Sequence, residues 1–220
     1  DAVALAHDLH SLLVASGNSG PYVLAGHSAG GLYVRVFAAT YPNEVAGVVL
    51  LDAQSPHTNS ASAIGEPPQS PIKTLAGMLP ALARVGVARL LLSAESSDLP
   101  PEFEAPRHAQ EVTAKGVSSF VTEFIELDHI QGAVAVLPDL GDRPLVVVTA
   151  VAEALGGWLD QQDRLATLST NVSHRVFPDL THVSLIESER GALASSEAIQ
   201  SVVQAIRSGT SLDGLTAGHQ

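Results

Sequence analysis

The sequence contains no cysteine, few basic residues, few aromatic residues and no long uninterrupted apolar run. The absence of cysteine excludes disulfides, zinc–thiolate sites and a cysteine nucleophile. Eleven Lys and Arg against 23 Asp and Glu give a formal net charge of −12. This charge argues against nucleic acid or anionic lipid as a partner and favours a small neutral or cationic substrate. Because aromatic residues make up 4% of the chain, recognition of sugars or bases by stacking is not expected.

The most apolar stretch runs from Ile72 to Ser93, but Lys73, Arg84 and Arg89 interrupt it, so the sequence predicts no membrane span. Hydrophobic residues nevertheless make up 45% of the 220 residues, which is ample for a sizeable core. The chain opens inside a helical pattern, and we therefore expect an N-terminal part to be missing. Cytoplasmic and secreted locations of a bacterial type both stay open, as does the oligomeric state.

Short apolar runs alternate with helical patterns along much of the chain. Strands are expected at 21–25, 45–51, 144–149 and 174–177, and helices at 1–16, 32–40, 158–169 and 197–207. Such alternation predicts an α/β fold with a parallel sheet.

The middle of the chain differs, because a Ser/Pro/Gly-rich stretch after Ala53 is followed by helical patterns near 72–92 and 102–130. We interpret residues 53–138 as an inserted cap, 1–52 and 139–209 as the core, and 210–220 as a flexible tail.

The motif GHSAGG, residues 26–31, lies between an expected strand and an expected helix. A serine hydroxyl needs a base, a carboxylate that orients the base, and N–H donors for the developing oxyanion. A sharp strand-to-helix turn would expose Ser28 as the nucleophile and would offer the N–H of Ala29 to the oxyanion.

The other residues of the motif are expected to shape this turn. Gly26 and Gly30 lie two residues on either side of Ser28, where a side chain is expected to collide with the turn, and Gly31 extends the clearance. His27 is expected to shape the turn rather than to act as the base. A glycine-rich packing turn is the alternative, and a phosphate-binding loop is disfavoured because the sequence contains neither G-x-x-x-x-G-K-[ST] nor G-x-G-x-x-G.

The stretch PYVLAGHSAGGLYVRVFAATYPNEVAGVVLLDA, followed later by PLVVVTA and THVSL, resembles the C-terminal two thirds of an α/β-hydrolase, over about residues 1–209. The resemblance implies a three-layer α/β-hydrolase sheet, mostly parallel, with a helical cap insertion and with the upstream strands missing. The expected strands would be the fifth to eighth of the family sheet, and the triad would run in the order serine, acid, histidine. Within this family, a serine at the strand-to-helix turn implies a reaction through an acyl-enzyme intermediate, without a cofactor or a metal.

The same resemblance assigns the base to His182, which follows the last expected strand, although Thr181 replaces the usual glycine. Two positions compete for the acid. Asp52 ends the 45–51 strand, and Glu153 lies a few residues beyond the 144–149 strand. Either carboxylate can work if it reaches the far imidazole nitrogen and stays charged. Asp160 or Asp163 is a further alternative, although both lie in a helical pattern where a solvated face is the simpler interpretation.

The resemblance and the motif together predict a serine hydrolase that acts on carboxylic esters or related acyl compounds. An apolar stripe in the 72–92 segment predicts a lid that favours a small apolar ester-type substrate. An amidase, a carbon–carbon hydrolase or a perhydrolase would use the same fold. A non-catalytic binding protein with this fold is the alternative of another class, since the second oxyanion donor would lie upstream. Trp158 is interpreted as an anchor for its helix.

Overall fold

The structure is a computed structural model that describes residues 2–56, 98–111 and 113–213. The chain divides into two compact units, one made of residues 1–57 and 130–220 and the other of residues 58–129. Each unit is described below by itself.

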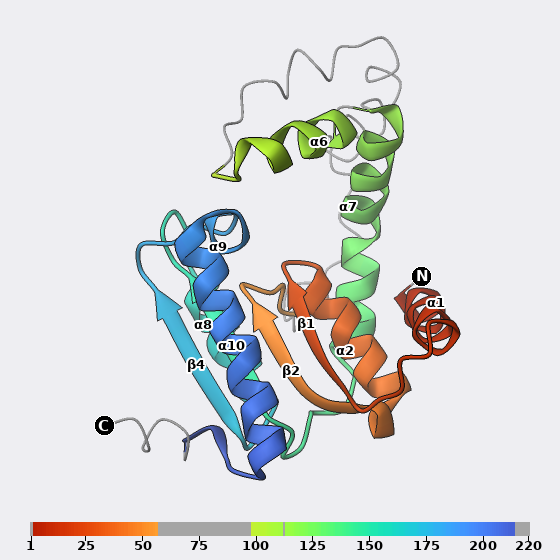
Figure 1. The fold of residues 1–220 in the computed structure, drawn as a ribbon, viewed down its shortest axis with the longest axis vertical. Coiled ribbons are helices and arrows are strands. Elements are labelled where there is room, and N and C mark those ends of the chain that lie inside the picture. The colour runs from red at the N-terminus through yellow and green to blue at the C-terminus, as the bar shows by residue number, and fades with distance from the viewer. Residues whose placement is uncertain (1, 57–97, 112, 214–220) are drawn as a thin grey trace, which may run out of the picture. The chain divides into compact units, whose positions relative to one another are not determined.

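The first unit is built on a four-stranded sheet in which all described strands are parallel and lie in chain order. Its strands are β1 (Tyr22–His27), β2 (Val45–Leu51), β3 (Leu145–Ala150) and β4 (Val172–Phe177). The prediction of four adjacent parallel strands is confirmed. The β2 and β3 strands read as continuous apolar runs because both of their faces are buried. Their carboxyl ends point to one edge of the sheet (Figure 1).

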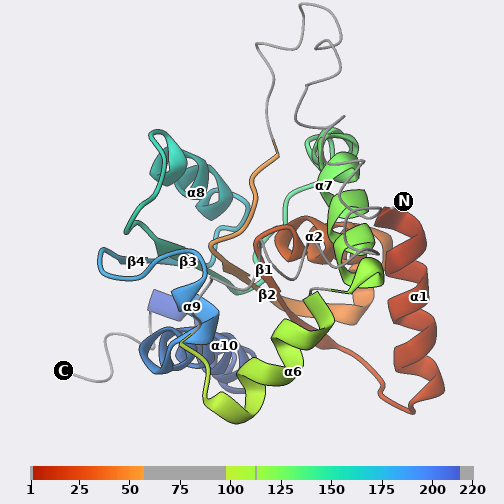
Figure 2. The ribbon, with the colours of Figure 1, turned by 90° about the horizontal axis from the view of Figure 1, so that it is seen from above.

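Helices cover both faces of the sheet, as the view from above shows (Figure 2). One face is covered by α10 (Glu189–Ser208), and the other by α2 (Gly30–Thr40) and α8 (Trp158–Ala166). The α1 helix (Ala2–Ala15) packs against α2, the 3₁₀ turn η1 (Pro42–Glu44) leads into β2, and the short α9 (Ser184–Glu187) precedes α10. The unit is therefore a three-layer α/β arrangement, as predicted.

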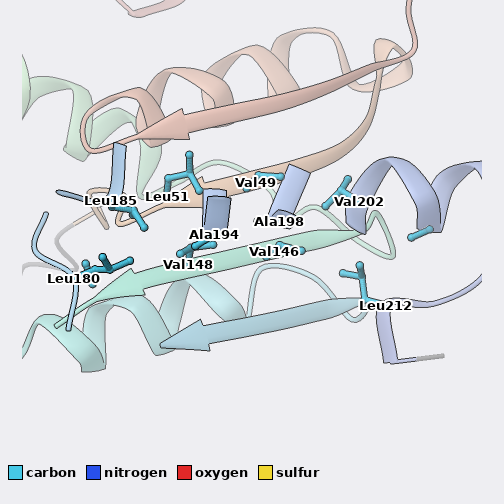
Figure 3. Close-up of a cluster of buried hydrophobic side chains, with 12 residues drawn as sticks. Val49, Leu51, Val146, Val148, Leu180, Leu185, Ala194, Ala198, Val202 and Leu212 are labelled. Carbon is cyan, nitrogen blue, oxygen red and sulfur yellow. The ribbon is translucent and has the colours of Figure 1, made fainter. Parts of the chain in front are cut away.

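Side chains that alternate along β2 and β3 pack beneath α10 and form one apolar core (Figure 3). The cluster contains Val49, Leu51, Val146, Val148, Ala150, Leu180, Leu185, Ala194, Ala198, Val202, Ala205 and Leu212. Full burial of one valine or leucine side chain stabilises a fold by about 1.5–3 kcal/mol. Since Leu180 and Leu185 flank the loop after β4, this core also fixes the loop that carries His182.

The second unit contains α6 (Pro101–Glu111) and the first part of α7 (Ala114–Val134). These helices confirm the helical pattern predicted over 102–130. The helix predicted at 72–92 lies outside the described residues, and the role of the insertion as a lid stays a prediction. No described helix is both long enough and apolar enough to cross a bilayer.

Leu212 belongs to the segment predicted as a flexible tail, and it is buried in the core. Its backbone N–H donates a hydrogen bond to Asn171 Oδ1 at 2.9 Å, which joins this segment to the start of β4. The packed structure therefore continues past α10 as far as Leu212.

Candidate active site

The predicted serine, both candidate acids and the predicted histidine follow four successive strands. Ser28 comes directly after β1, Asp52 directly after β2, Glu153 soon after β3, and His182 a few residues after β4. Because the strands are parallel, these residues gather at the carboxyl edge of one sheet. Ser28, Asp52 and Glu153 are also the three non-glycine residues with positive φ in the described chain, at 55°, 44° and 64°. Such strained backbone concentrates at functional sites.

Ser28 occupies a sharp turn between β1 and α2. Its backbone N–H donates to Leu51 O at 3.2 Å, and its carbonyl accepts from the N–H of Gln54 at 2.9 Å, so the turn is tied to the end of β2. Neither Ser28 Oγ nor the N–H of Ala29 has a hydrogen-bond partner among the described residues. The turn therefore leaves a hydroxyl and a backbone donor available side by side.

Two glycines of the motif are required by close backbone approach. A β carbon at position 26 would lie 2.5 Å from Gly30 O, and one at position 31 would overlap the Cβ atom of Ala53. The collision predicted at Gly30 itself is wrong, because a β carbon there meets no described heavy atom within 4 Å outside its own helix. The backbone of Gly30 is instead what approaches Gly26, so the steric requirement falls on the first glycine.

Asp52 is fully buried, and described donors reach both of its carboxylate oxygens. Oδ1 accepts hydrogen bonds from the backbone N–H of Ala150 at 3.0 Å and from Trp158 Nε1 at 2.8 Å. Oδ2 is 2.6 Å from His182 Nδ1. A buried carboxylate with three donors is both fixed in position and compensated for the loss of water.

Glu153 is exposed, and its carboxylate has no hydrogen-bond or ion-pair partner among the described residues. Of the two carboxylates that the sequence left open, the structure brings Asp52 to His182 and leaves Glu153 apart. Asp163, one of the further alternatives, contacts a different histidine, His174. Asp160 lies in the first turn of α8 and makes no hydrogen bond with His182.

His182 lies in a turn that two neighbouring side chains close. The N–H of Thr181 donates to Ser184 Oγ at 2.8 Å, and the N–H of Ser184 donates to Thr181 Oγ1 at 3.1 Å. This reciprocal pair is a helix-start arrangement that satisfies two free donors. This pair gives a physical role to Thr181, which stands directly before His182 where the resemblance led us to expect a glycine. The His182 side chain is 41% exposed, although its Nδ1 atom contacts the buried Asp52.

Two aromatic side chains flank His182, and no sequence pattern predicts this role for either. Trp158 donates to Asp52 and lies edge-on to the His182 ring, with ring centroids 6.3 Å apart. His27 Nε2 is 3.0 Å from the His182 carbonyl oxygen, and the two rings are 4.4 Å apart. Burial lowers the pKa of His27 below its ordinary 6.5. The hydrogen bond to the His182 carbonyl and the charge of Asp52 act to raise it, and the charge of His182 lowers it further.

The α8 helix, which carries Trp158, is itself anchored to the turn after β2. Gln162 is fully buried, and its Nε2 donates to the carbonyl of Ala53 at 2.8 Å. Trp158 is the one tryptophan of the chain, and a spacing of 106 residues from Asp52 follows no local rule that a sequence pattern could reveal. The contact depends on how α8 packs on the sheet, so local sequence patterns do not predict it.

A second histidine, His174 on β4, also contacts a carboxylate and in addition contacts a hydroxyl. His174 on β4 places Nε2 at 2.7 Å from Thr149 Oγ1 and Nδ1 at 3.1 Å from Asp163 Oδ1. Thr149 lies within β3 and is completely buried. This group joins β3, β4 and α8, and it lies apart from the Ser28 turn in the sequence and in its strand positions.

Comparison with known proteins agrees with this architecture. Residues 2–91 match a family model described as the alpha/beta hydrolase fold. A stretch of 40 residues is 55% identical to an uncharacterized protein of Schizosaccharomyces pombe. This match covers 18% of the present chain and spans 8% of the length of that relative.

Solved structures resemble the chain over most of its length. A candidate lipase from Acinetobacter baumannii AYE has a TM-score of 0.66 and 19% identity, covering 96% of this chain and 69% of its own. A thermophilic esterase from Thermogutta terrifontis, solved with malate bound, has a TM-score of 0.52 and 20% identity, covering 93% and 72%. A further thermophilic esterase has a TM-score of 0.61 and 15% identity, covering 94% and 74%. At these identities the likeness concerns the fold. The sheet, the strand-to-helix turn and these matches show that the chain has the alpha/beta hydrolase fold.

Proposed function

We propose that the chain is a serine hydrolase that acts on carboxylic esters, or related acyl compounds, through an acyl-enzyme intermediate. The observation that carries this proposal is the 2.6 Å contact between His182 Nδ1 and the buried carboxylate of Asp52, next to the strained turn of Ser28. In this role Asp52 orients the imidazole, so that Nε2 is left to take a proton.

The proposed reaction uses four groups of the chain. His182 Nε2 removes the hydroxyl proton of Ser28 while Oγ attacks the ester carbonyl, and the N–H of Ala29 donates to the developing oxyanion. As the tetrahedral adduct collapses, the imidazolium returns the proton to the leaving alcohol and an acyl ester of Ser28 remains. Water then attacks this ester with His182 again as the base, and the carboxylic acid and free Ser28 are released.

The electrostatic environment supports these roles. An imidazolium that forms on His182 faces a carboxylate whose side chain is 2% exposed, and an ion pair with a buried partner is weakened less by solvent and salt than a surface pair. Trp158 and Ala150 hold the other oxygen of Asp52, so its charge stays directed at His182. The preference for an apolar acyl or alcohol group rests on the stripe in 72–92 and stays part of the proposal.

Labelling with a fluorophosphonate, which reacts with activated serines, tests the proposal directly. The peptide that contains Ser28 is expected to carry the label, and Ser28→Ala is expected to abolish both labelling and the hydrolysis of short p-nitrophenyl esters. His182→Gln is expected to lower the labelling rate by at least about 10³-fold, because it removes the base.

The matched control is His174→Gln, which removes a histidine of the same sheet with a carboxylate and a hydroxyl as partners. It is expected to retain labelling of Ser28. A folded wild-type chain, as judged by circular dichroism, that shows neither labelling nor ester turnover would contradict the hydrolase and favour a non-catalytic binding protein.

A further inference from the structure

His27, the residue directly before Ser28, is directed across the site toward His182. Its Nε2 atom lies 3.0 Å from the His182 carbonyl oxygen, although the two residues are 155 positions apart in the chain. The two imidazole rings have centroids 4.4 Å apart and are inclined by 33°. One side chain therefore contacts both the backbone and the ring of the proposed base.

Two other side chains contact the ring of His182. Asp52 holds Nδ1, and the edge contact with Trp158 limits the ring on another side. Neither contact holds the carbonyl of His182. The core leucines anchor the ends of its loop and the Thr181–Ser184 pair closes its turn, but the hydrogen bond to the His182 carbonyl comes from His27. The His182 imidazole is 41% exposed, so holding it in one rotamer costs conformational entropy that few packing contacts offset. A further contact that fixes the residue therefore stabilises this position.

The contact also specifies the protonation of His27. A carbonyl oxygen only accepts, so Nε2 of His27 must carry the hydrogen. Burial favours the neutral form of His27, and so does the charge of His182, whereas Asp52 and the His182 carbonyl favour the charged form. A neutral His27 with its hydrogen on Nε2 can therefore hold His182 without repelling the imidazolium that the proposed reaction forms.

We propose that His27 is a positioning residue, which fixes the backbone and the ring of His182 beside Asp52. This inference rests on the proposed function for its catalytic meaning, but the positioning can be measured without any turnover.

Two variants separate the hydrogen bond from the ring. His27→Gln keeps an amide donor near the position of Nε2, whereas His27→Phe keeps a planar ring without a donor. The readout is the proton NMR signal of His182 Nδ1–H, which a short charge-assisted hydrogen bond to Asp52 shifts far downfield. The signal is assigned by its loss in His182→Gln.

His27→Gln is expected to keep the downfield signal, and His27→Phe is expected to broaden or lose it. The fluorophosphonate labelling rate of Ser28 is expected to fall by about 10-fold in His27→Phe and to recover in His27→Gln, because small misplacements of a reacting group are costly. If His27→Phe does not fold, His27→Asn, whose amide is too short to reach the carbonyl, replaces it.

An unchanged downfield signal in His27→Phe or His27→Asn would overturn the positioning role, whether or not Ser28 reacts. A wild-type chain that shows the signal and its dependence on His27 but no labelling would instead contradict the proposed function alone. Equal losses of labelling in the Gln and Phe variants, with both signals intact, would also overturn the inference, since they would separate His27 from the placement of His182.

Discussion

His182 and His174 each contact one carboxylate, but the burial of the imidazole and of the carboxylate is reversed between the two pairs. His182 is 41% exposed and contacts Asp52, whose side chain is 2% exposed. His174 is 17% exposed and contacts Asp163, whose side chain is 62% exposed, while its other partner, Thr149, is completely buried. In one group the carboxylate is protected and the imidazole is accessible, and in the other the carboxylate is accessible and the hydroxyl is enclosed.

This difference separates a candidate reactive site from a structural one. A buried carboxylate acts on its histidine at low dielectric, whereas an exposed ion pair is screened by water and salt. A substrate can approach a hydroxyl on a strained turn at the end of a strand, but it cannot approach Thr149 inside β3. The pattern of hydrogen bonds alone therefore does not mark a site, and position along the strand and exposure must be read with it.

The largest expected effect compares the two carboxylates. Asp52→Asn is expected to lower the labelling rate of Ser28 by about 10³-fold or more, because the amide no longer favours the required tautomer and charge of His182. Asp163→Asn is expected to leave this rate close to that of the wild type. Rates are measured with fluorophosphonate at pH 7, with circular dichroism as the check of folding. Similar losses in both variants would remove the distinction between the two histidines.

The second prediction compares the hydroxyls of Thr149 and Ser28. For stability we expect the larger loss in the His174 group, whereas for labelling it is expected in the His182 group. Thr149→Val is expected to lower the free energy of unfolding by about 1–3 kcal/mol, because it leaves His174 Nε2 without its partner in a mostly buried position. Ser28→Ala is expected to change it by less than about 0.5 kcal/mol, as at other accessible positions. Urea unfolding measures both. A larger loss for Ser28→Ala than for Thr149→Val would show that the Ser28 turn is the structural element.

An intermediate effect is expected from the indole that holds Asp52. Trp158→Phe keeps a ring edge near His182 but removes the 2.8 Å hydrogen bond to Asp52 Oδ1. We expect the labelling rate of Ser28 to fall by about 10-fold, since hydrogen bonds to charged groups contribute about 1.5–3 kcal/mol. Leu159→Ala, at the exposed neighbouring position of α8, is the matched control. Equal rates in the two variants would assign Trp158 to helix anchoring, as the sequence suggested.

The two central strands, β2 and β3, could be predicted from the sequence because they are buried on both faces. The predicted bounds of β2 agree with the structure at both ends, and those of the other strands differ by at most two residues at either end. The start of α10 was missed, since helix α10 begins at Glu189 rather than at position 197. Ser188 caps it through its contact with the N–H of Gly191, and the polar first turn has little apolar periodicity.

The candidate site could be predicted in part. The motif predicted Ser28 directly after a strand, and the resemblance to a known fold predicted His182 in the loop after the last strand. The choice between Asp52 and Glu153 could not be made from the sequence, since both follow strands at the same edge of the sheet. The contact with His182 depends on the directions of two loops, which hydrophobic patterns do not encode. The same reason hid the contacts of His27 and Trp158.

The smallest expected effect concerns the charge of His27. Its pKa in the folded chain lies below the ordinary 6.5, chiefly because of burial, so the unfolded chain binds this proton at a higher pH than the folded chain does. The associated stability is present above pH 6.5 and is lost as the pH falls through the lower pKa of the folded state. Urea unfolding of the wild type is therefore expected to show a steeper loss of stability below pH 6.5 than unfolding of His27→Gln. His174→Gln controls for the removal of any one histidine. Parallel pH profiles for the wild type and His27→Gln would mean that His27 accepts a proton beside His182 at no cost, and the neutral form proposed for it would then be wrong.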